Sequence, residues 1–225
     1  MKSDAQLKQE ILQELDWDPA VDATDVGVIV KDGVVTLAGH LGTFAEKYAA
    51  GRAAQRVRGV RALCIELEVR LADPFKREDR EIAAAAQRSL EWNTLVPGNV
   101  HAKVEKGWVT LTGDVQWDYQ RKEAERAVRY LRGVVGLSNL ITVKGLVYLI
   151  SVEPAVSAAE VKKGIQQALE RHAGREAQKL QVAVDGARVT LRGNVDSWAD
   201  VRAALGAAWS APGVACVVNE LAVTY

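Results

Sequence analysis

The side chains that most often carry catalysis or bind metals are sparse in this sequence. The three histidines, His40, His101 and His172, lie far apart, and none has a second histidine or a cysteine within four residues. A zinc site needs three or four such ligands, usually in closely spaced pairs. No serine lies in a nucleophile-elbow pattern, and no glycine-rich loop precedes a helix as in phosphate-binding loops. We therefore expect no enzyme, no metal and no cofactor, and we interpret the histidines as surface side chains.

A basic segment at residues 119–132, YQRKEAERAVRYLR, offers binding chemistry instead. Apolar residues recur at i, i+3, i+4 and i+7 from Ala124, which predicts a helix with one buried face and its cationic side chains outward or flanking. Near an anionic bilayer each Lys or Arg contributes about 1 kcal/mol. The alternative is a solvated helix face with Arg–Glu pairs. The candidate lipid-binding residues are Arg121, Lys122, Arg126, Arg129 and Arg132, with Tyr119 and Tyr130 as interfacial rings.

Because the apolar face would be untouched, exchanging three of these cations for glutamate is expected to leave folding nearly intact. The variant Lys122→Glu/Arg126→Glu/Arg129→Glu should then lose binding to anionic vesicles and its sensitivity to salt.

Three of the six tryptophans form a second candidate site. Trp17 and Trp92 each come two residues after the last apolar residue of a predicted helix. Each ring either packs over the end of the core, which we favour, or lies at a lipid interface. Strand alternation directs Trp108 away from the core, where it is either covered by a neighbouring unit or offered to a ligand.

The elements that would position these residues recur three times. Val-Thr-Leu-x-Gly occurs at 35–39, 109–113 and 189–193, and a Gly-Val pair starts 20 residues after each closing glycine. Such self-similarity predicts tandem units and has to be recognised before any other pattern. The glycines that we assign to turns and strand ends are Gly33, Gly39, Gly59, Gly107, Gly113, Gly133, Gly186, Gly193 and Gly213.

Each unit has the pattern of a helix, two alternating strands joined at a glycine turn, an alanine-rich helix and a last strand. The glycine of each Gly-Val pair is expected to cap the second helix. Because the strands are apolar on one face only, both helices should cover that face and leave the other to solvent or a partner. The expected fold class is α+β, with three α-β-β-α-β units at 1–72, 76–146 and 154–225, each a small mixed sheet.

Two further expectations concern single positions in these units. Ser3 and Ser157 are placed as N-caps of the first helix in the first and third units. Cys64 and Cys216 are the only cysteines, too few for small domains held together by disulfides. We expect them to be free, buried thiols.

A unit of this order with Gly-x-Val-Thr-Leu-x-Gly, a Gly-Val pair and then an Asn resembles the BON domain, named for bacterial osmotically inducible and nodulation proteins. The Asn is present as Asn139 and Asn219, whereas the first unit has Ile65 there, and the third unit has an extra residue, Ala187, after its turn glycine. The resemblance implies a non-catalytic binding module of bacterial envelope and stress proteins, associated with phospholipid membranes. Family members that bind potassium in the cytoplasm imply a second possibility.

We therefore expect a soluble protein of bacterial stress or envelope type that associates with anionic phospholipid. The alternative is a cytoplasmic scaffold or potassium-responsive protein, with a protein partner or self-association. The net charge of zero gives no general argument for nucleic-acid binding. The first residues, MKSDAQLKQEILQELD, lack the pattern of a signal peptide. This favours the cytoplasm, or the periplasm if the sequence starts after processing.

Overall fold

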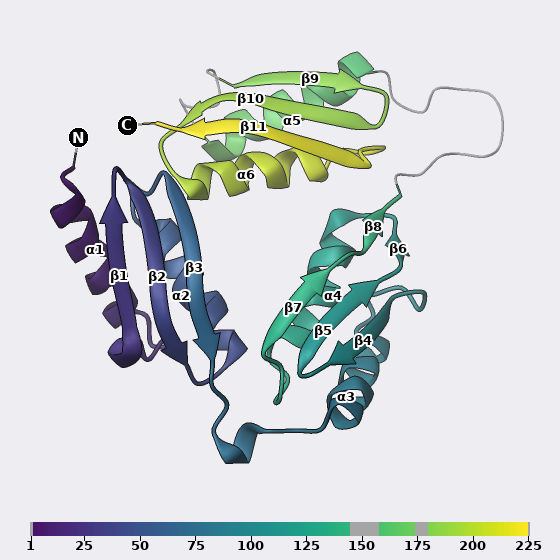
Figure 1. Cartoon of the computed structure of the whole chain (residues 1–225). Helices are drawn as coiled ribbons and strands as arrows, with labels where there is room; N and C mark the ends of the chain where they lie inside the picture. The colour runs from purple at the N-terminus through teal and green to yellow at the C-terminus, as the bar shows by residue number, and fades with distance from the viewer. Residues whose placement is uncertain (1, 145–157, 174–179, 225) are drawn as a thin grey trace. The chain divides into compact units, whose positions relative to one another are not determined.

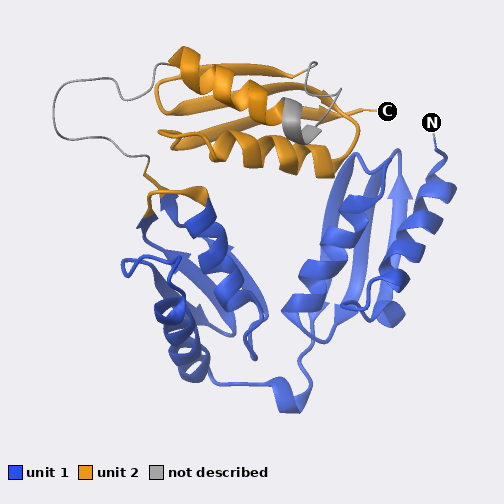
Figure 2. Ribbon diagram, turned by 180° about the vertical axis from the view of Figure 1, so that it is seen from behind, with its two compact units in different colours: residues 1–114, 119–142 blue, residues 115–118, 143–225 orange. Residues whose placement is uncertain are grey.

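The computed structural model describes residues 2–144, 158–173 and 180–224. The chain divides into two compact units, residues 1–114 with 119–142 and residues 115–118 with 143–225 (Figure 2). The first compact unit contains the first α-β-β-α-β repeat and most of the second, and the other compact unit contains the third.

The first repeat has the predicted order of elements (Figure 1). Strand β1 pairs antiparallel with β2, and β2 pairs in parallel with β3, so β2 is the central strand of a mixed sheet. The parallel pair requires a crossover connection, which is α2. The elements are α1 (Asp4–Trp17), a 3-10 turn (Ala23–Asp25), β1 (Val26–Lys31), β2 (Val34–Leu41), α2 (Phe44–Arg56) and β3 (Ala62–Val69).

The second repeat has the same topology with shorter strands. β4 pairs antiparallel with β5, and β5 pairs in parallel with β7. The short pair of β6 and β8 continues this parallel ladder, since the Thr142 N–H donates to the Gly113 carbonyl (3.0 Å). The elements are a 3-10 turn (Asp73–Phe75), α3 (Asp79–Trp92), β4 (His101–Glu105), β5 (Trp108–Thr112), β6 (Asp114–Val115), α4 (Asp118–Arg129), β7 (Gly136–Asn139) and β8 (Thr142–Val143).

The third repeat again places its second strand at the centre, with β9 antiparallel and β11 parallel to β10. The expected cap Ser157 lies outside the described residues. The elements are α5 (Ala158–Ala173), β9 (Gln181–Asp185), β10 (Arg188–Val195), α6 (Trp198–Trp209) and β11 (Cys216–Val223).

One face of each sheet is buried under the two helices of its repeat, as predicted. The Val and Leu of each Val-Thr-Leu motif are fully buried, and each contributes about 1.5–3 kcal/mol of burial free energy. Alanines let the second helix lie close to the sheet, since Ala50, Ala53, Ala124 and Ala204 have no exposed area. The mixed α+β fold with both helices on one face is therefore confirmed. The motif residues in this core are Val35, Leu37, Val109, Leu111, Val189 and Leu191.

A carboxylate at the start of the first helix holds the hairpin turn in two repeats. Asp79 accepts hydrogen bonds from the backbone N–H groups of Lys106 (2.6 Å) and Gly107 (2.8 Å). Asp4 binds the turn at 32–33 in the same way. Both central residues of each turn have positive φ, as a type I′ turn requires.

The third hairpin is built differently. Asp185 and Arg188 face each other across the ladder, so its loop also has two residues, Gly186 and Ala187. Gly186 has a φ of +55° and comes first in the loop, as in a type II′ turn. The extra residue, Ala187, takes the second position of the loop, which is a glycine in the other two hairpins, and the turn type therefore differs. At the position of the aspartate that holds the turn in the other repeats, the third repeat has Ala158.

Asp79→Ala is expected to lower the free energy of unfolding of the second repeat by about 2 kcal/mol, because two backbone donors lose a charged acceptor. Urea denaturation followed by circular dichroism measures the change. Asp73→Ala removes an exposed carboxylate six residues earlier and should leave stability unchanged. Equal stability of both variants would contradict the role of Asp79.

Two expectations about single positions are wrong. Cys64 is exposed and Cys216 is half-buried, because both face away from the helices, opposite Thr36 and Arg188. The glycine of the first Gly-Val pair also does not cap α2, whose C-cap is Val57. That glycine lies two residues later, in the turn that leads to β3. By contrast, the predicted N-cap at Ser3 is confirmed by its hydrogen bond with the Gln6 N–H (3.2 Å).

Candidate functional site

The outer face of α4 carries two basic side chains between two aromatic ones. Tyr119, Lys122, Arg126 and Tyr130 are spaced at i, i+3, i+7 and i+11, which places them along one side of the helix and its end. Tyr119 is 51% and Tyr130 63% exposed, and both cations are exposed. We call these four residues the outer stripe. The ion pair of Arg126 with Glu123 is long (3.7 Å) and solvent-exposed, so it holds the guanidinium weakly.

Arg129 does not belong to the outer stripe. Its side chain is 10% exposed and forms an ion pair with Glu125, one turn earlier on α4. The guanidinium carbon lies 3.5 Å from the centroid of the Tyr48 ring, a cation–π contact. Its Nε is buried and has no hydrogen-bond partner among the described residues. Of the two predicted placements, outward or flanking, Arg129 therefore has the flanking one, and the expectation that the triple glutamate variant leaves folding nearly intact is wrong.

Glu125 is held in turn by the last strand of the repeat. The Asn139 amide donates to the Arg121 carbonyl (3.0 Å) and to Glu125 Oε2 (3.3 Å), and its Oδ1 accepts from the Ile141 N–H (3.2 Å). In the first repeat the residues at positions 125 and 139 are replaced by Gly51 and Ile65, and a Cβ on the glycine would lie 2.9 Å from Ile65 Cδ1. An apolar contact replaces the polar one, which explains why the first repeat lacks the Asn.

The remaining basic candidates lie at the borders of this face. Arg121 is half-buried, whereas Arg132 is exposed and follows the end of α4. The Arg132 guanidinium carbon lies 5.6 Å from the centroid of the Phe75 ring. A role of these two arginines in binding stays a prediction.

Trp17 and Trp92 are the last residues of α1 and α3, and their rings are 84% and 87% exposed. The expectation that they pack over the core is wrong, because both residues lie at the C-terminal end of a helix and remain exposed to solvent. A hydrogen bond from Ser89 Oγ to the Ala127 carbonyl (2.7 Å) joins the C-terminal halves of α3 and α4. Trp92 therefore belongs to the same end of the repeat as Tyr130.

The charges around Trp17 are already paired. Arg56 donates to Glu14 Oε1 (2.6 Å) and to Asp18 Oδ2 (2.8 Å), beside a shallow pocket that Trp17 also lines. The hydrogen bond from Arg56 holds the pKa of Asp18 below its usual value. In the second repeat the residue equivalent to Arg56 is Tyr130, so this pairing has no counterpart there.

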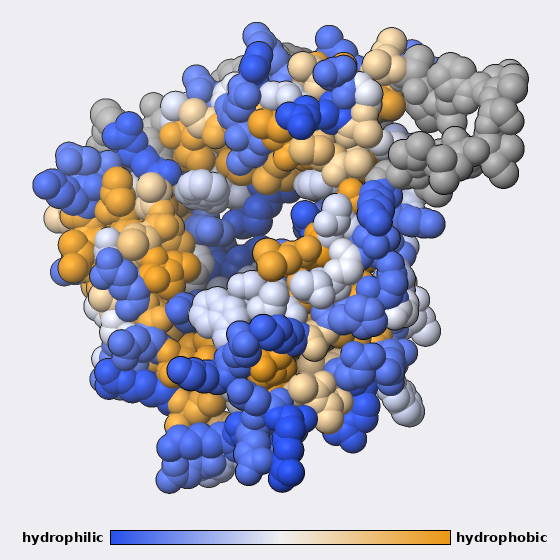
Figure 3. All heavy atoms as spheres, turned by 45° about the vertical axis from the view of Figure 1, so that its right-hand side comes forward, coloured by the Kyte–Doolittle hydropathy of each residue, from blue (hydrophilic) through white to orange (hydrophobic). Residues whose placement is uncertain are grey.

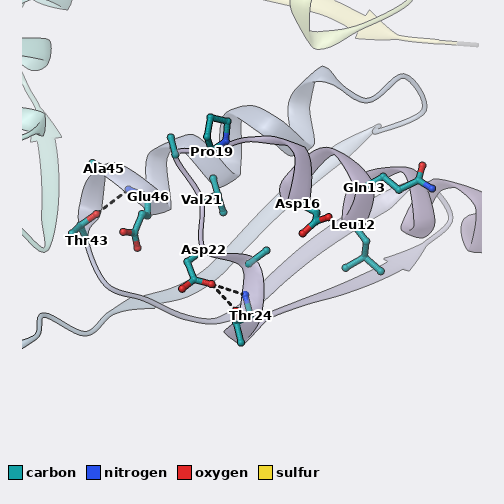
Figure 4. A pocket seen from close by; sticks show the side chains of 12 residues that line it. Leu12, Gln13, Asp16, Pro19, Val21, Asp22, Thr24, Thr43, Ala45 and Glu46 are labelled. Carbon is teal, nitrogen blue, oxygen red and sulfur yellow. Dashed lines mark hydrogen bonds between the residues drawn. The ribbon is translucent and has the colours of Figure 1, made fainter.

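A second shallow pocket lies at the end of α1, between the loop after this helix and the start of α2 (Figure 4). Two of its carboxylates are held by neighbouring groups. Glu46 accepts from the Gly42 N–H (2.9 Å), and Asp22 accepts from the N–H (3.1 Å) and hydroxyl (2.7 Å) of Thr24, which lowers the pKa of Asp22. Through these contacts both carboxylates stabilise the local backbone conformation.

The histidines do not assemble into a site within the part of the chain that the structure describes. His40 Nε2 lies 3.2 Å from Asp25 Oδ2, and His101 is exposed on β4. The side chain of His172 lies outside the described residues. No group of three or more His, Cys, Asp or Glu that could hold a metal occurs among the residues described.

Comparison with protein families agrees with the repeat structure. The model of the BON domain matches residues 3–70, 78–145 and 157–225. The chain belongs to the BON domain family. The three BON repeats account for most of its length, and the family supports a non-catalytic binding or structural role.

Comparisons with individual proteins add little to this. No curated protein matches the sequence. CdsD, a structural protein of the type III secretion system of Chlamydia trachomatis, is 13% identical with a TM-score of 0.26 over 97% of this chain and 92% of that one. The PrgH periplasmic domain is 10% identical with a TM-score of 0.19, over 95% of this chain and 100% of that one. Values this low support no argument about arrangement or function.

The BON repeats contain two contacts that sequence patterns did not predict. One is the hydrogen bond between Asn139 and Glu125. Both positions differ in the first repeat, which has Ile65 and Gly51 there, and this joint difference could have indicated the contact. The other lies on the open face of the second sheet, where Trp108 packs over Gly136. Strand alternation indicated the face of Trp108 correctly but not what lies beneath its ring.

Proposed function

We propose that the protein is a non-catalytic BON protein that binds anionic phospholipid surfaces through its second repeat. The outer stripe supports this, because it combines two exposed cations with two exposed tyrosines on one side of a helix. Tyrosine rings favour the polar interface of a bilayer, and lysine and arginine favour anionic headgroups. Trp92 adds a ring that is 87% exposed at the same end of the repeat.

The charge of the outer stripe is a property of this repeat and not of the fold. The equivalent helix of the third repeat, α6, contains one Arg and one Asp in WADVRAALGAAW. At about 1 kcal/mol for each cation, Lys122 and Arg126 contribute roughly 2 kcal/mol near an anionic surface. Such binding is reversible and weakens as salt increases.

Association would take place at the surface of the bilayer. Among the described residues, no helix has the length and apolar character needed to cross a membrane. On the side of the molecule shown in Figure 3, hydrophobic residues at the surface are interrupted by hydrophilic ones. Because the apolar face of α4 is buried in its own repeat, the outer stripe would contact the headgroups and would not insert as an amphipathic helix does.

The double variant Lys122→Glu/Arg126→Glu tests the proposal. It is expected to lower affinity for phosphatidylcholine vesicles containing phosphatidylglycerol by at least about 30-fold, because two favourable charges of roughly 1 kcal/mol each are lost. Vesicle co-sedimentation measures binding, with pure phosphatidylcholine as the neutral comparison. Both replaced side chains are exposed, so the thermal unfolding curve should not change.

Lys162→Glu/Lys163→Glu is the matched control, since it makes the same change of charge at two exposed positions of α5. This control should bind anionic vesicles almost as the wild type does. Equal binding by both double variants would reject the outer stripe as the site. Loss of binding in Trp17→Ala/Trp92→Ala would then assign binding to the two helix ends.

A further inference from the structure

The second repeat presents a tryptophan on the face of its sheet that the helices leave open. Trp108 lies at the start of β5, with Glu105 opposite on β4 and Gly136 opposite on β7. The next positions along this face are Thr110 and Ser138, which are also partners in the ladder. Trp108 is 47% exposed. The indole is therefore accessible, although it lies in the middle of a sheet.

The Trp108 ring is fixed flat against the sheet. A Cβ on Gly136 would collide with carbon atoms of the six-membered ring, so the ring covers the glycine backbone. The indole Nε1 donates a hydrogen bond to Ser138 Oγ (2.9 Å). The ring is thus held at two points, and its exposed side forms a flat apolar platform.

The fold does not require this platform. The pair equivalent to Trp108 and Gly136 is Val34 with Ala62 in the first repeat, where the ladder has the same register. In the third repeat it is Arg188 with Cys216. Neither pair contains an aromatic residue or a glycine. The large Trp108 side chain and the glycine that makes room for it therefore occur together in the second repeat.

We propose that this platform binds a neutral pyranose ring of a glycan. One side of a β-linked pyranose is a plane of C–H groups that stacks on an aromatic face, while its edge carries hydroxyl groups. The hydroxyls of Thr110 and Ser138 lie next to Trp108 on the same face, with Thr112 further along β5, and these groups can pair with the sugar hydroxyls.

The charges of this face favour a neutral ligand. Lys103 Nζ lies 2.9 Å from Glu105 Oε1, so the cation and the carboxylate that β4 places on this face neutralise each other. A nucleic acid also stacks bases on aromatic residues, but it requires a groove with excess positive charge for its phosphates. A lipid-interface tryptophan directs its N–H toward headgroups, whereas here the N–H is bound to Ser138.

Isothermal titration calorimetry of the full chain with cellohexaose and with chitohexaose tests the proposal. We expect saturable binding of at least one of these oligosaccharides. Trp108→Ala should weaken it by about tenfold or more, since stacking supplies much of the contact. Gly136→Val should have a similar effect by displacing the ring, and Ser138→Ala should weaken binding several-fold because the ring loses its fixed orientation.

Trp92→Ala is the matched control, because it removes an exposed tryptophan from a helix end and should leave glycan binding unchanged. The proposal does not rest on lipid binding, and Lys122→Glu/Arg126→Glu should bind the oligosaccharide as the wild type does. Failure of both oligosaccharides to bind would overturn the proposal. Binding of single-stranded DNA that depends on Trp108, or self-association in sedimentation velocity that Trp108→Ala abolishes, would also overturn it.

Discussion

Gly113→Ala is expected to destabilise the second repeat by about 3 kcal/mol or more, the largest effect of any single methyl group that we predict. The backbone φ at Gly113 is +126°, a conformation that residues with a side chain rarely adopt. A Cβ there would also collide with the carbonyl oxygen of Asn99. Gly39 and Gly193 have φ values of +123° and +134°, so the same constraint explains the closing glycine in all three repeats.

Hydrogen exchange measured by mass spectrometry is the appropriate assay, because three repeats need not unfold in one transition. Exchange in β5 and α4 should accelerate strongly in Gly113→Ala, while exchange in the third repeat stays unchanged. Gly98→Ala is the control, since a Cβ at that position meets no atom within 4 Å. Similar exchange in both variants would show that the closing glycine is not required by its conformation.

Arg129→Glu is expected to destabilise the second repeat by about 3 kcal/mol, because removing the cation from a largely buried position leaves the partly buried Glu125 without its partner. The new carboxylate would face Glu125, and the stacking partner of Tyr48 would be lost. Thermal unfolding followed by circular dichroism, with hydrogen exchange to locate the change in α4, measures this effect.

Arg126→Glu makes the same substitution three residues earlier, where 69% of the side chain is exposed. Its free energy of unfolding should stay within about 0.5 kcal/mol of the wild type. If both variants were equally stable, Arg129 would be a surface residue, and the three-residue glutamate variant would again be a valid test of lipid binding.

The repeat pattern predicted the fold class because backbone requirements are local. Gly33 and Gly107 have positive φ in type I′ turns, and the Val and Leu of each Val-Thr-Leu motif alternate into a buried face. The conformation of a short turn and the period of a strand depend on neighbouring residues. They can therefore be inferred from sequence without knowledge of the tertiary structure.

The candidate site was predicted less well, because helical periodicity indicates in which direction a side chain points but not which other residues it meets there. Arg126 and Arg129 both belong to the polar side of α4 in the sequence pattern. The structure leaves Arg126 in solvent, whereas it places Arg129 between Glu125 and the Tyr48 ring. The predicted packing of Trp17 and Trp92 failed for the related reason that a ring at a helix end needs a neighbour to cover it.

The sequence by itself determined the three BON repeats, the order of their elements and the buried face of the hairpin strands, including the open face for Trp108. Only the tertiary structure decided that Gly136 and Ser138 hold the Trp108 ring flat, that Cys64 is exposed and that Asn139 holds Glu125. The physical reason is that these contacts join residues on different strands and helices. Their geometry depends on the register of parallel strands brought together by a crossover helix, and no short sequence pattern specifies that register.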